Sequence, residues 1–193
     1  MDALQALLTR SSPARLKEPA PNGAVLQSIL DAAMRAPDHG RLRPWRFLVL
    51  RGEARARFGE LMAESLKRRD PTATPPLLDK ERAKPLRAPL IVVVAAEIVE
   101  GHKIPAVEQL LAAGASAQNL QLAAHALGFG TVWRTGAPAY DPFVKQALGF
   151  KPADAIIGFM YLGTPDAPQD VSAAPAQAKP GPTPAQLIRD WNG

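Results

Sequence analysis

Proline sets the tightest limit on how this chain can fold. The sequence of 193 residues contains 20 prolines, and a proline inside a helix or a central strand removes a backbone hydrogen bond and clashes with the turn before it. The proline-free spans therefore mark the regular elements. The longest of them covers residues 106–137.

Three proline-free spans near the N-terminus show the apolar spacing of helices. The first lies ahead of Pro13, the second covers residues 22–35 with Asn22 as its cap, and the third follows Gly52. Their apolar positions are Leu4, Leu7 and Leu8; Leu26, Ile29, Leu30 and Ala33; and Phe58, Leu61, Met62 and Leu66.

The longest span begins with a helix that should end at Gly128. Its middle, residues 112–117, reads Ala-Ala-Gly-Ala-Ser-Ala, and such small side chains let another backbone approach closely. Polar residues along it, among them Glu108 and Gln118, exclude a bilayer span. We expect this helix to be buried in protein, against its copy in a second subunit.

Four strands are predicted between these helices, at residues 45–50, 90–96, 130–134 and 155–162. Residues 90–96 form a continuous apolar run, which indicates burial on both faces. A short helix between the last two strands should be capped by Asp141, with Pro142 in its first turn. Helices that alternate with buried strands predict a mixed α/β sandwich.

Two segments lack these patterns. Residues 68–89 are polar and interrupted by prolines, which predicts a mobile surface excursion, with a lid over a site as the alternative reading. After Gly163 the chain has six prolines between Pro165 and Pro184, which predicts an extended tail without a core. We therefore expect one domain over residues 1–165 and a proline-rich extension over residues 166–193.

Composition excludes several chemistries. There is no cysteine, so thiolate nucleophiles, disulfides and iron–sulfur clusters are excluded. No Walker loop, dinucleotide fingerprint or hydrolase elbow is present, because Gly128 and Gly130 precede a strand and the Ser116 region lies inside a helix. The three histidines have no metal-ligand spacing, so no metal is expected.

The net charge of +5 suits an anionic ligand such as a phosphate. Two clusters that combine arginine with hydroxyl groups lie at the ends of predicted elements, where phosphates are commonly held. They are Arg10, Ser11 and Ser12 after the first helix, and Trp133, Arg134 and Thr135 at the end of the third strand. Taken alone, an arginine at such an end is more often a solvated C-terminal cap than a ligand.

Three ordered stretches together resemble the FMN-dependent nitroreductase family, in particular its compact bacterial branch of NAD(P)H nitroreductases. They are the Arg10 cluster; Ala36 to His39 followed by Arg43 to Phe47; and residues 114–133, which span a whole helix, its glycine stop and the next strand. The similarity runs from Met1 to about Pro165.

The resemblance implies an α+β fold, a three-layer sandwich with a central mixed sheet flanked by helices. It also implies a homodimer with FMN at the subunit interface. By position, Arg10, Ser11 and Ser12 would hold the ribityl phosphate region, and Trp133, Arg134 and Thr135 would complete the phosphate pocket. Arg35 and His39 would approach the flavin from the partner chain.

The chain departs from the family pattern at several of these positions. Ser11 stands where a second basic residue is common, and Ala14 stands where the family has a Lys or Arg. A cation near flavin N1 and O2 stabilises the reduced flavin, and Arg15, Arg35 and Arg41 are the candidates for it. Leu42 and Arg43 replace a polar residue and a Gln ahead of Pro44, which could change substrate preference.

The resemblance implies hydride transfer from NAD(P)H through FMN to an electron-poor acceptor such as a nitroaromatic or a quinone, in a ping-pong sequence. This needs no protein acid or base, which agrees with the lack of a catalytic dyad. A flavin-binding module without significant turnover is the alternative, and a nucleic-acid binder is disfavoured by the scattered charges. The N-terminus has no leader pattern, so a cytoplasmic protein without membrane or nucleic-acid partners is expected.

Overall fold

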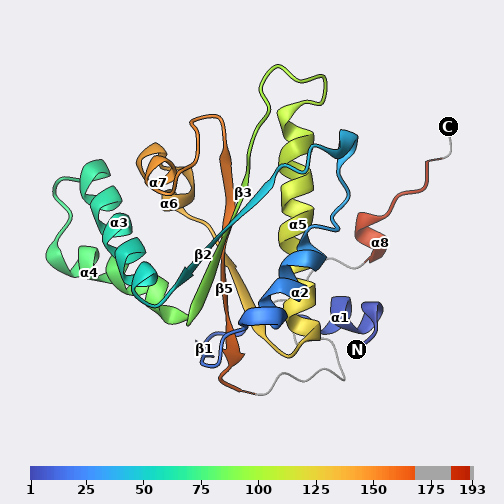
Figure 1. Cartoon of the computed structure of the whole chain (residues 1–193), viewed down its shortest axis with the longest axis horizontal. Coiled ribbons are helices and arrows are strands. Elements are labelled where there is room, and N and C mark those ends of the chain that lie inside the picture. The colour runs from blue at the N-terminus through green and yellow to red at the C-terminus, as the bar shows by residue number, and fades with distance from the viewer. Residues whose placement is uncertain (168–183, 192–193) are drawn as a thin grey trace.

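The structure, a computed structural model, describes residues 1–167 and 184–191. Most of the proline-rich extension predicted over residues 166–193 lies outside the described residues. Within them the chain forms a central sheet with helices on both faces, arranged in three layers (Figure 1).

The sheet is built around the last strand in the sequence. β5 (Ala155–Pro165) pairs with β3 (Leu90–Ala96), with β4 (Gly130–Arg134) and, at its end, with the short β1 (Leu16–Lys17). β3 pairs in turn with β2 (Trp45–Arg51), which lies at the opposite edge from β4. The four strands predicted from the sequence are confirmed.

The prediction of a mixed sheet is wrong for this chain, because every strand pair among the described residues is antiparallel. The apolar run of Leu90–Ala96 does make β3 buried at all seven positions, as predicted. That burial does not require parallel neighbours, because helices cover both faces of this antiparallel sheet.

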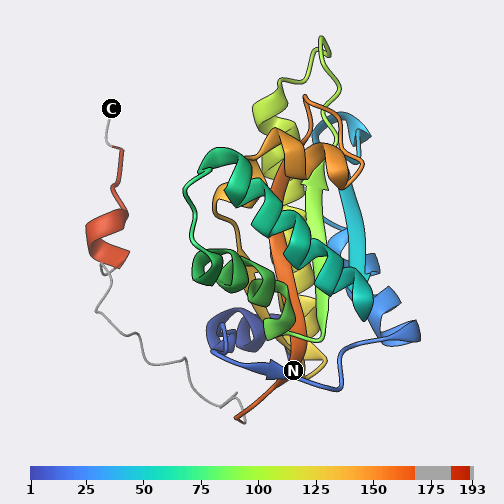
Figure 2. The same ribbon diagram turned by 90° about the vertical axis from the view of Figure 1, so that its left-hand side faces the viewer.

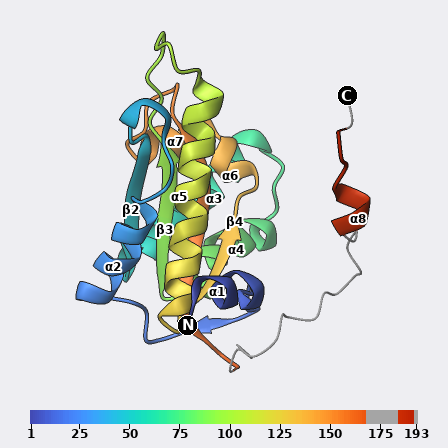
Figure 3. The same ribbon diagram turned by 90° about the vertical axis from the view of Figure 1, so that its right-hand side faces the viewer.

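One face of the sheet is covered by α2 (Gly23–Ala33) and α5 (Ala106–Ala126), with α1 (Ala3–Thr9) beside the end of α5 (Figure 3). Asn22 occupies the N-cap position of α2, but its side chain makes no capping hydrogen bond. The core on this face includes Leu26, Ile29, Leu120, Met160 and Leu162. Alternate residues of β3 and β5 thus point toward α2 and α5.

The other face is covered by α3 (Glu53–Arg69), α4 (Pro75–Ala83), α6 (Ala137–Tyr140) and α7 (Pro142–Ala147), as Figure 2 shows for α3 and α4. Its core includes Phe58, Met62, Val93, Phe159 and Tyr161. The predicted cap of α7 is confirmed, since Asp141 accepts a hydrogen bond from the Phe143 backbone N–H at 2.9 Å.

Residues 68–89, predicted as a mobile surface excursion, contain helices that the sequence analysis did not predict. This segment contains α4 and the 3-10 helix η2 (Lys84–Arg87), packed on α3. Pro75 and Pro76 lie in the first turn of α4. Backbone N–H groups there have no acceptor within the helix, so proline removes no helical hydrogen bond. Gly59 permits the close packing, because a Cβ there would lie 2.4 Å from the Arg82 carbonyl oxygen.

Two further helices complete the described chain. The 3-10 turn η1 (His39–Arg41) precedes β2, and α8 (Pro184–Leu187) follows the segment that the structure does not describe. Among the described residues, no helix has the length and apolar character needed to cross a membrane.

Candidate active site

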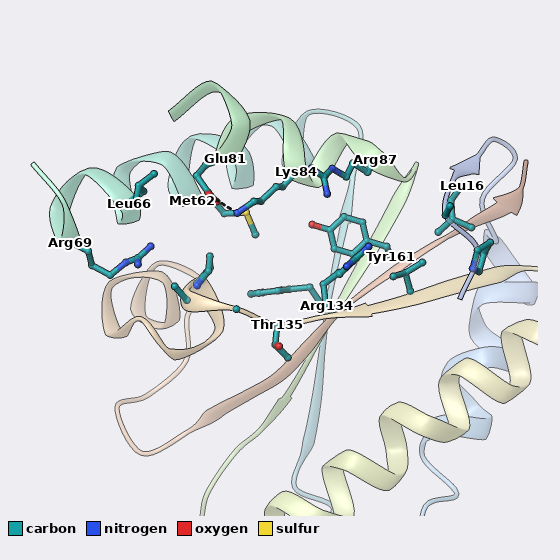
Figure 4. A pocket seen from close by; sticks show the side chains of 17 residues that line it. Leu16, Met62, Leu66, Arg69, Glu81, Lys84, Arg87, Arg134, Thr135 and Tyr161 are labelled. Carbon is teal, nitrogen blue, oxygen red and sulfur yellow. Dashed lines mark hydrogen bonds and ion pairs between the residues drawn. The ribbon is translucent and has the colours of Figure 1, made fainter. Parts of the chain in front are cut away.

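A cavity of about 320 Å³ lies between the β4–β5 part of the sheet and the layer of α3, α4 and η2 (Figure 4). Its volume is at the lower end of the range of roughly 300–1,000 Å³ that is common for small-molecule sites. Apolar side chains supply much of its wall, and they include Leu16, Met62, Leu66, Val132, Pro138 and Phe159.

The charged side chains that line this cavity are mostly cationic. Arg69, Lys84, Arg87 and Arg134 face one carboxylate, Glu81. Lys84 forms an ion pair with Glu81, whereas Arg87 and Arg134 have no hydrogen bond or ion pair with any described residue. The cavity therefore has an excess of positive charge and suits an anionic ligand.

Tyr161 points its hydroxyl group into the cavity from the middle of β5 (Figure 4). The residue is 6% exposed, and burial raises the pKa of its phenol to about 12, although Arg87 and Arg134 act in the opposite direction. No described residue accepts or donates a hydrogen bond at this hydroxyl. At neutral pH Tyr161 is an uncharged donor available to a ligand.

We expect the raised pKa of Tyr161 to lower stability in alkali. The unfolded phenol loses its proton near pH 10.0, whereas the folded one keeps it to about pH 12. The free energy of unfolding should therefore be unaffected by this group below pH 10.0 and fall, on the order of 2 kcal/mol, as the pH rises to about 12. Urea unfolding of wild type and Tyr161→Phe across this range tests it. Equal losses in both proteins would contradict the assignment.

Arg69, the last residue of α3, is held at the end of the cavity by a buried carboxylate. Its Nε lies 3.6 Å from Asp141 Oδ2. Asp141 is 9% exposed, caps α7 and accepts a hydrogen bond from the buried Ser65 hydroxyl. This ion pair joins the end of α3 to the N-cap of α7.

The two clusters predicted from the sequence stand differently toward this cavity. Arg134 and Thr135 line it directly. Arg10, Ser11 and Ser12 follow α1, and the next two residues, Pro13 and Ala14, form part of the cavity wall. Arg10 Nη1 lies 3.4 Å from Ser12 Oγ.

The side chain of Trp133 lies on the opposite face of the sheet. Its indole N–H donates to the Ile157 carbonyl oxygen at 3.1 Å, and the ring packs in the core beneath α5. A Cβ at Gly158 would lie 2.2 Å from the indole nitrogen, so the glycine makes room for the ring. Any contact between Trp133 and a ligand in the cavity would involve its main chain.

Arg35 and His39 lie elsewhere, beside the start of β2. Arg35 lines a hollow of about 230 Å³ together with Arg41 and Arg43. His39 Nδ1 lies 2.5 Å from Glu108 Oε2 in the first turn of α5. Within one chain these residues are at the edge of the sheet away from β4, so they do not reach the cavity.

Of the charged residues that line this cavity, sequence reasoning missed four, namely Arg69, Glu81, Lys84 and Arg87. All four belong to the segment at and after the end of α3 that was predicted to be a mobile surface excursion. The signal available in the sequence was the high density of basic residues there, which fitted the alternative reading of a lid. Tyr161 was also missed, because a tyrosine in a buried strand looks like a core residue.

Comparisons with known proteins agree with one another. Residues 9–164 match the model of the Nitroreductase family. The chain is 45% identical over 184 residues to "Putative NAD(P)H nitroreductase YdjA" of Escherichia coli K12, covering 95% of this chain and 97% of that protein.

Solved structures share the fold. A nitroreductase-like family protein from Bacillus cereus superposes with a TM-score of 0.82 at 23% identity, covering 100% of this chain and 97% of that one. A protein from Desulfovibrio desulfuricans, described as a putative nitroreductase in complex with FMN, gives a TM-score of 0.71 at 26% identity, covering 100% and 99%. The chain therefore belongs to the nitroreductase family.

Proposed function

We propose that the protein is an FMN-dependent oxidoreductase that passes hydride from NAD(P)H to an electron-poor acceptor such as a nitroaromatic or a quinone. The observation that carries this proposal is the cavity at which residues 13–14 and 134–136 meet. The family relationship and the FMN complex of the Desulfovibrio protein support it.

The donor set of the cavity fits FMN. Arginine forks and hydroxyl groups are suited to phosphate oxygens, and Arg134, Thr135 and the neighbouring Arg10, Ser11 and Ser12 supply both. The apolar wall suits a planar ring system. We assign these residues to FMN, with the Trp133 side chain excluded because it faces the core.

The cation near the flavin is best supplied by the lid side of the cavity. Arg15, Arg35 and Arg41, the candidates from the sequence, do not line it, whereas Lys84 and Arg87 of η2 do. Ala14, the position at which the family pattern has a basic residue, lines the same cavity. We assign stabilisation of negative charge on the reduced flavin to Lys84 and Arg87.

When bound, FMN supplies the hydride chemistry. The chain binds and orients its ligands, keeps the Tyr161 hydroxyl protonated as a hydrogen-bond donor, and holds positive charge in a partly enclosed space where it is weakly screened. A ping-pong sequence follows if donor and acceptor use the same face in turn.

We further propose a homodimer in which Arg35 and His39 reach the flavin of the partner subunit. The outer face of α5 exposes Val107 and Leu111, which are 58% and 67% exposed, and α1 exposes Leu4, Leu7 and Leu8. Large apolar side chains gathered on neighbouring helices are typical of a protein interface. In an isologous contact through this face, each subunit would contribute its own His39 loop to the flavin site of the other.

The test is an absorbance spectrum of the purified protein, followed by anaerobic NADPH or NADH in the same cuvette. Flavin bands near roughly 370 and 450 nm that bleach on addition support the reductase. Bands that persist support a flavin-binding module without turnover. A colourless protein that does not take up added FMN would refute both.

A further inference from the structure

We propose that the physiological acceptor is an anionic aromatic compound that carries a carboxylate or a comparable oxyanion, and that Arg69 binds this group. The inference rests on the proposed function and deepens it, because it assigns the substrate class and a residue that determines specificity. It is carried by the orientation of Arg69, by the walls beside it and by the charge balance of the cavity.

Arg69 has an ion-pair partner at the end of the cavity before any ligand arrives. Its ion pair with Asp141 uses the Nε side of the guanidinium, and no other partner of Arg69 is found among the described residues. The two terminal nitrogens are thus available, and they form the fork that matches a carboxylate. The Asp141 carboxylate is itself restrained, because it also accepts hydrogen bonds from the Phe143 backbone N–H at the start of α7 and from the Ser65 hydroxyl.

The surroundings of Arg69 suit an aromatic body attached to the charged group. Met62 and Leu66 come from the same helix, and Pro138 comes from α6. In Figure 4, Arg69 stands at one end of the cavity and Leu16 at the other, with Arg134 and Thr135 between them. Seen from Leu16, the end at Arg69 therefore lies beyond Arg134 and Thr135, the residues assigned to the flavin phosphate.

The other cations of the cavity have different surroundings. Lys84 is paired with Glu81, and Arg87 and Arg134 act on Tyr161 electrostatically. Arg69 is the cation whose partner is a buried structural carboxylate rather than a cavity residue. The overall excess of positive charge would also raise the local concentration of an anionic acceptor.

The experiment compares 4-nitrobenzoate with 4-nitrobenzamide, which has the same ring and nitro group but no charge. With FMN-loaded protein and NAD(P)H, we expect wild type to favour the anion in kcat/KM. We expect Arg69→Gln to reduce this preference, the ratio of the two kcat/KM values, by about tenfold to a hundredfold, mainly through the KM for 4-nitrobenzoate. Arg69→Lys should keep part of the preference.

The matched control is Arg68→Gln. Arg68 precedes Arg69 on α3, pairs with Glu64 and lies over the Phe143 ring at 3.9 Å, but it does not line the cavity. The preference for the anion should be intact in this variant. A second readout is isothermal calorimetry of 4-nitrobenzoate binding to the oxidised protein without NAD(P)H, in which Arg69→Gln should weaken binding by a similar factor.

An unchanged preference and unchanged binding in Arg69→Gln would overturn the inference. A change confined to the KM for NADPH relative to NADH would also overturn it, because Arg69 would then serve the phosphate of the donor. A wild-type protein that binds FMN but oxidises no NAD(P)H refutes the proposed reductase function instead. In that case the calorimetric comparison still decides whether Arg69 binds the anion.

Discussion

Leu111→Asp is expected to convert the protein into a monomer that loses its flavin. Leu111 is 67% exposed on α5 within one chain, and in the proposed dimer it would be buried. Burial of one leucine contributes roughly 1.5–3 kcal/mol, and a buried unpaired carboxylate costs more. Because a symmetric interface contains the residue twice, the dimer dissociation constant should rise by a factor on the order of a thousand or more.

Sedimentation equilibrium measures this directly, against the chain mass of 20.6 kDa. Retention of FMN during ultrafiltration should fall in parallel, because Arg35 and His39 of the second subunit would be removed. The matched control is Leu77→Asp, which places the same charge at a leucine that is 47% exposed on α4, in the opposite layer. A Leu111→Asp protein that stays dimeric would show that the subunits meet through another face.

Arg134→Ala is expected to weaken FMN binding by about tenfold to a hundredfold, the value of one or two hydrogen bonds to a charged group. Arg134 ends β4, lines the cavity and has no partner among the described residues. If it holds the phosphate, riboflavin, which lacks that group, should bind the variant and wild type equally. Arg134→Lys should be intermediate because it keeps the charge and loses the fork.

Quenching of flavin fluorescence on titration with apoprotein gives both dissociation constants. Arg57→Ala is the control, since Arg57 pairs with Glu53 on the exposed side of α3 and does not line the cavity. If the variant loses FMN and riboflavin affinity equally, Arg134 contacts the ring rather than the phosphate. Unchanged affinity for both ligands would remove Arg134 from the site.

Elements with a strong local pattern could be predicted from the sequence. The apolar stripes predicted α1, α2 and α3, and the long proline-free span predicted α5, because the amphipathic period and the absence of proline depend on neighbouring residues alone. The run Leu90–Ala96 predicted a strand buried on both faces for the same reason. Arg134 and Thr135 were singled out as an arginine and a hydroxyl at the end of a predicted strand, the resemblance assigned them to FMN, and they do line the cavity.

Only the tertiary structure decided the features that depend on contacts between distant residues. Strand direction was one of them, because burial on two faces is compatible with either parallel or antiparallel pairing. Helix α4 was another, since its short and polar sequence forms a helix against α3, where Gly59 leaves room for the Arg82 carbonyl.

The candidate site shows the same division. Local sequence supplied arginines and hydroxyls at the ends of elements, but it could not show that Trp133 turns toward α5 while Arg134 turns toward the cavity. Nor could it bring Arg69, Lys84 and Tyr161 together, since they come from α3, η2 and β5. Their proximity follows from packing α3 and α4 on the sheet, a long-range interaction that no local pattern records.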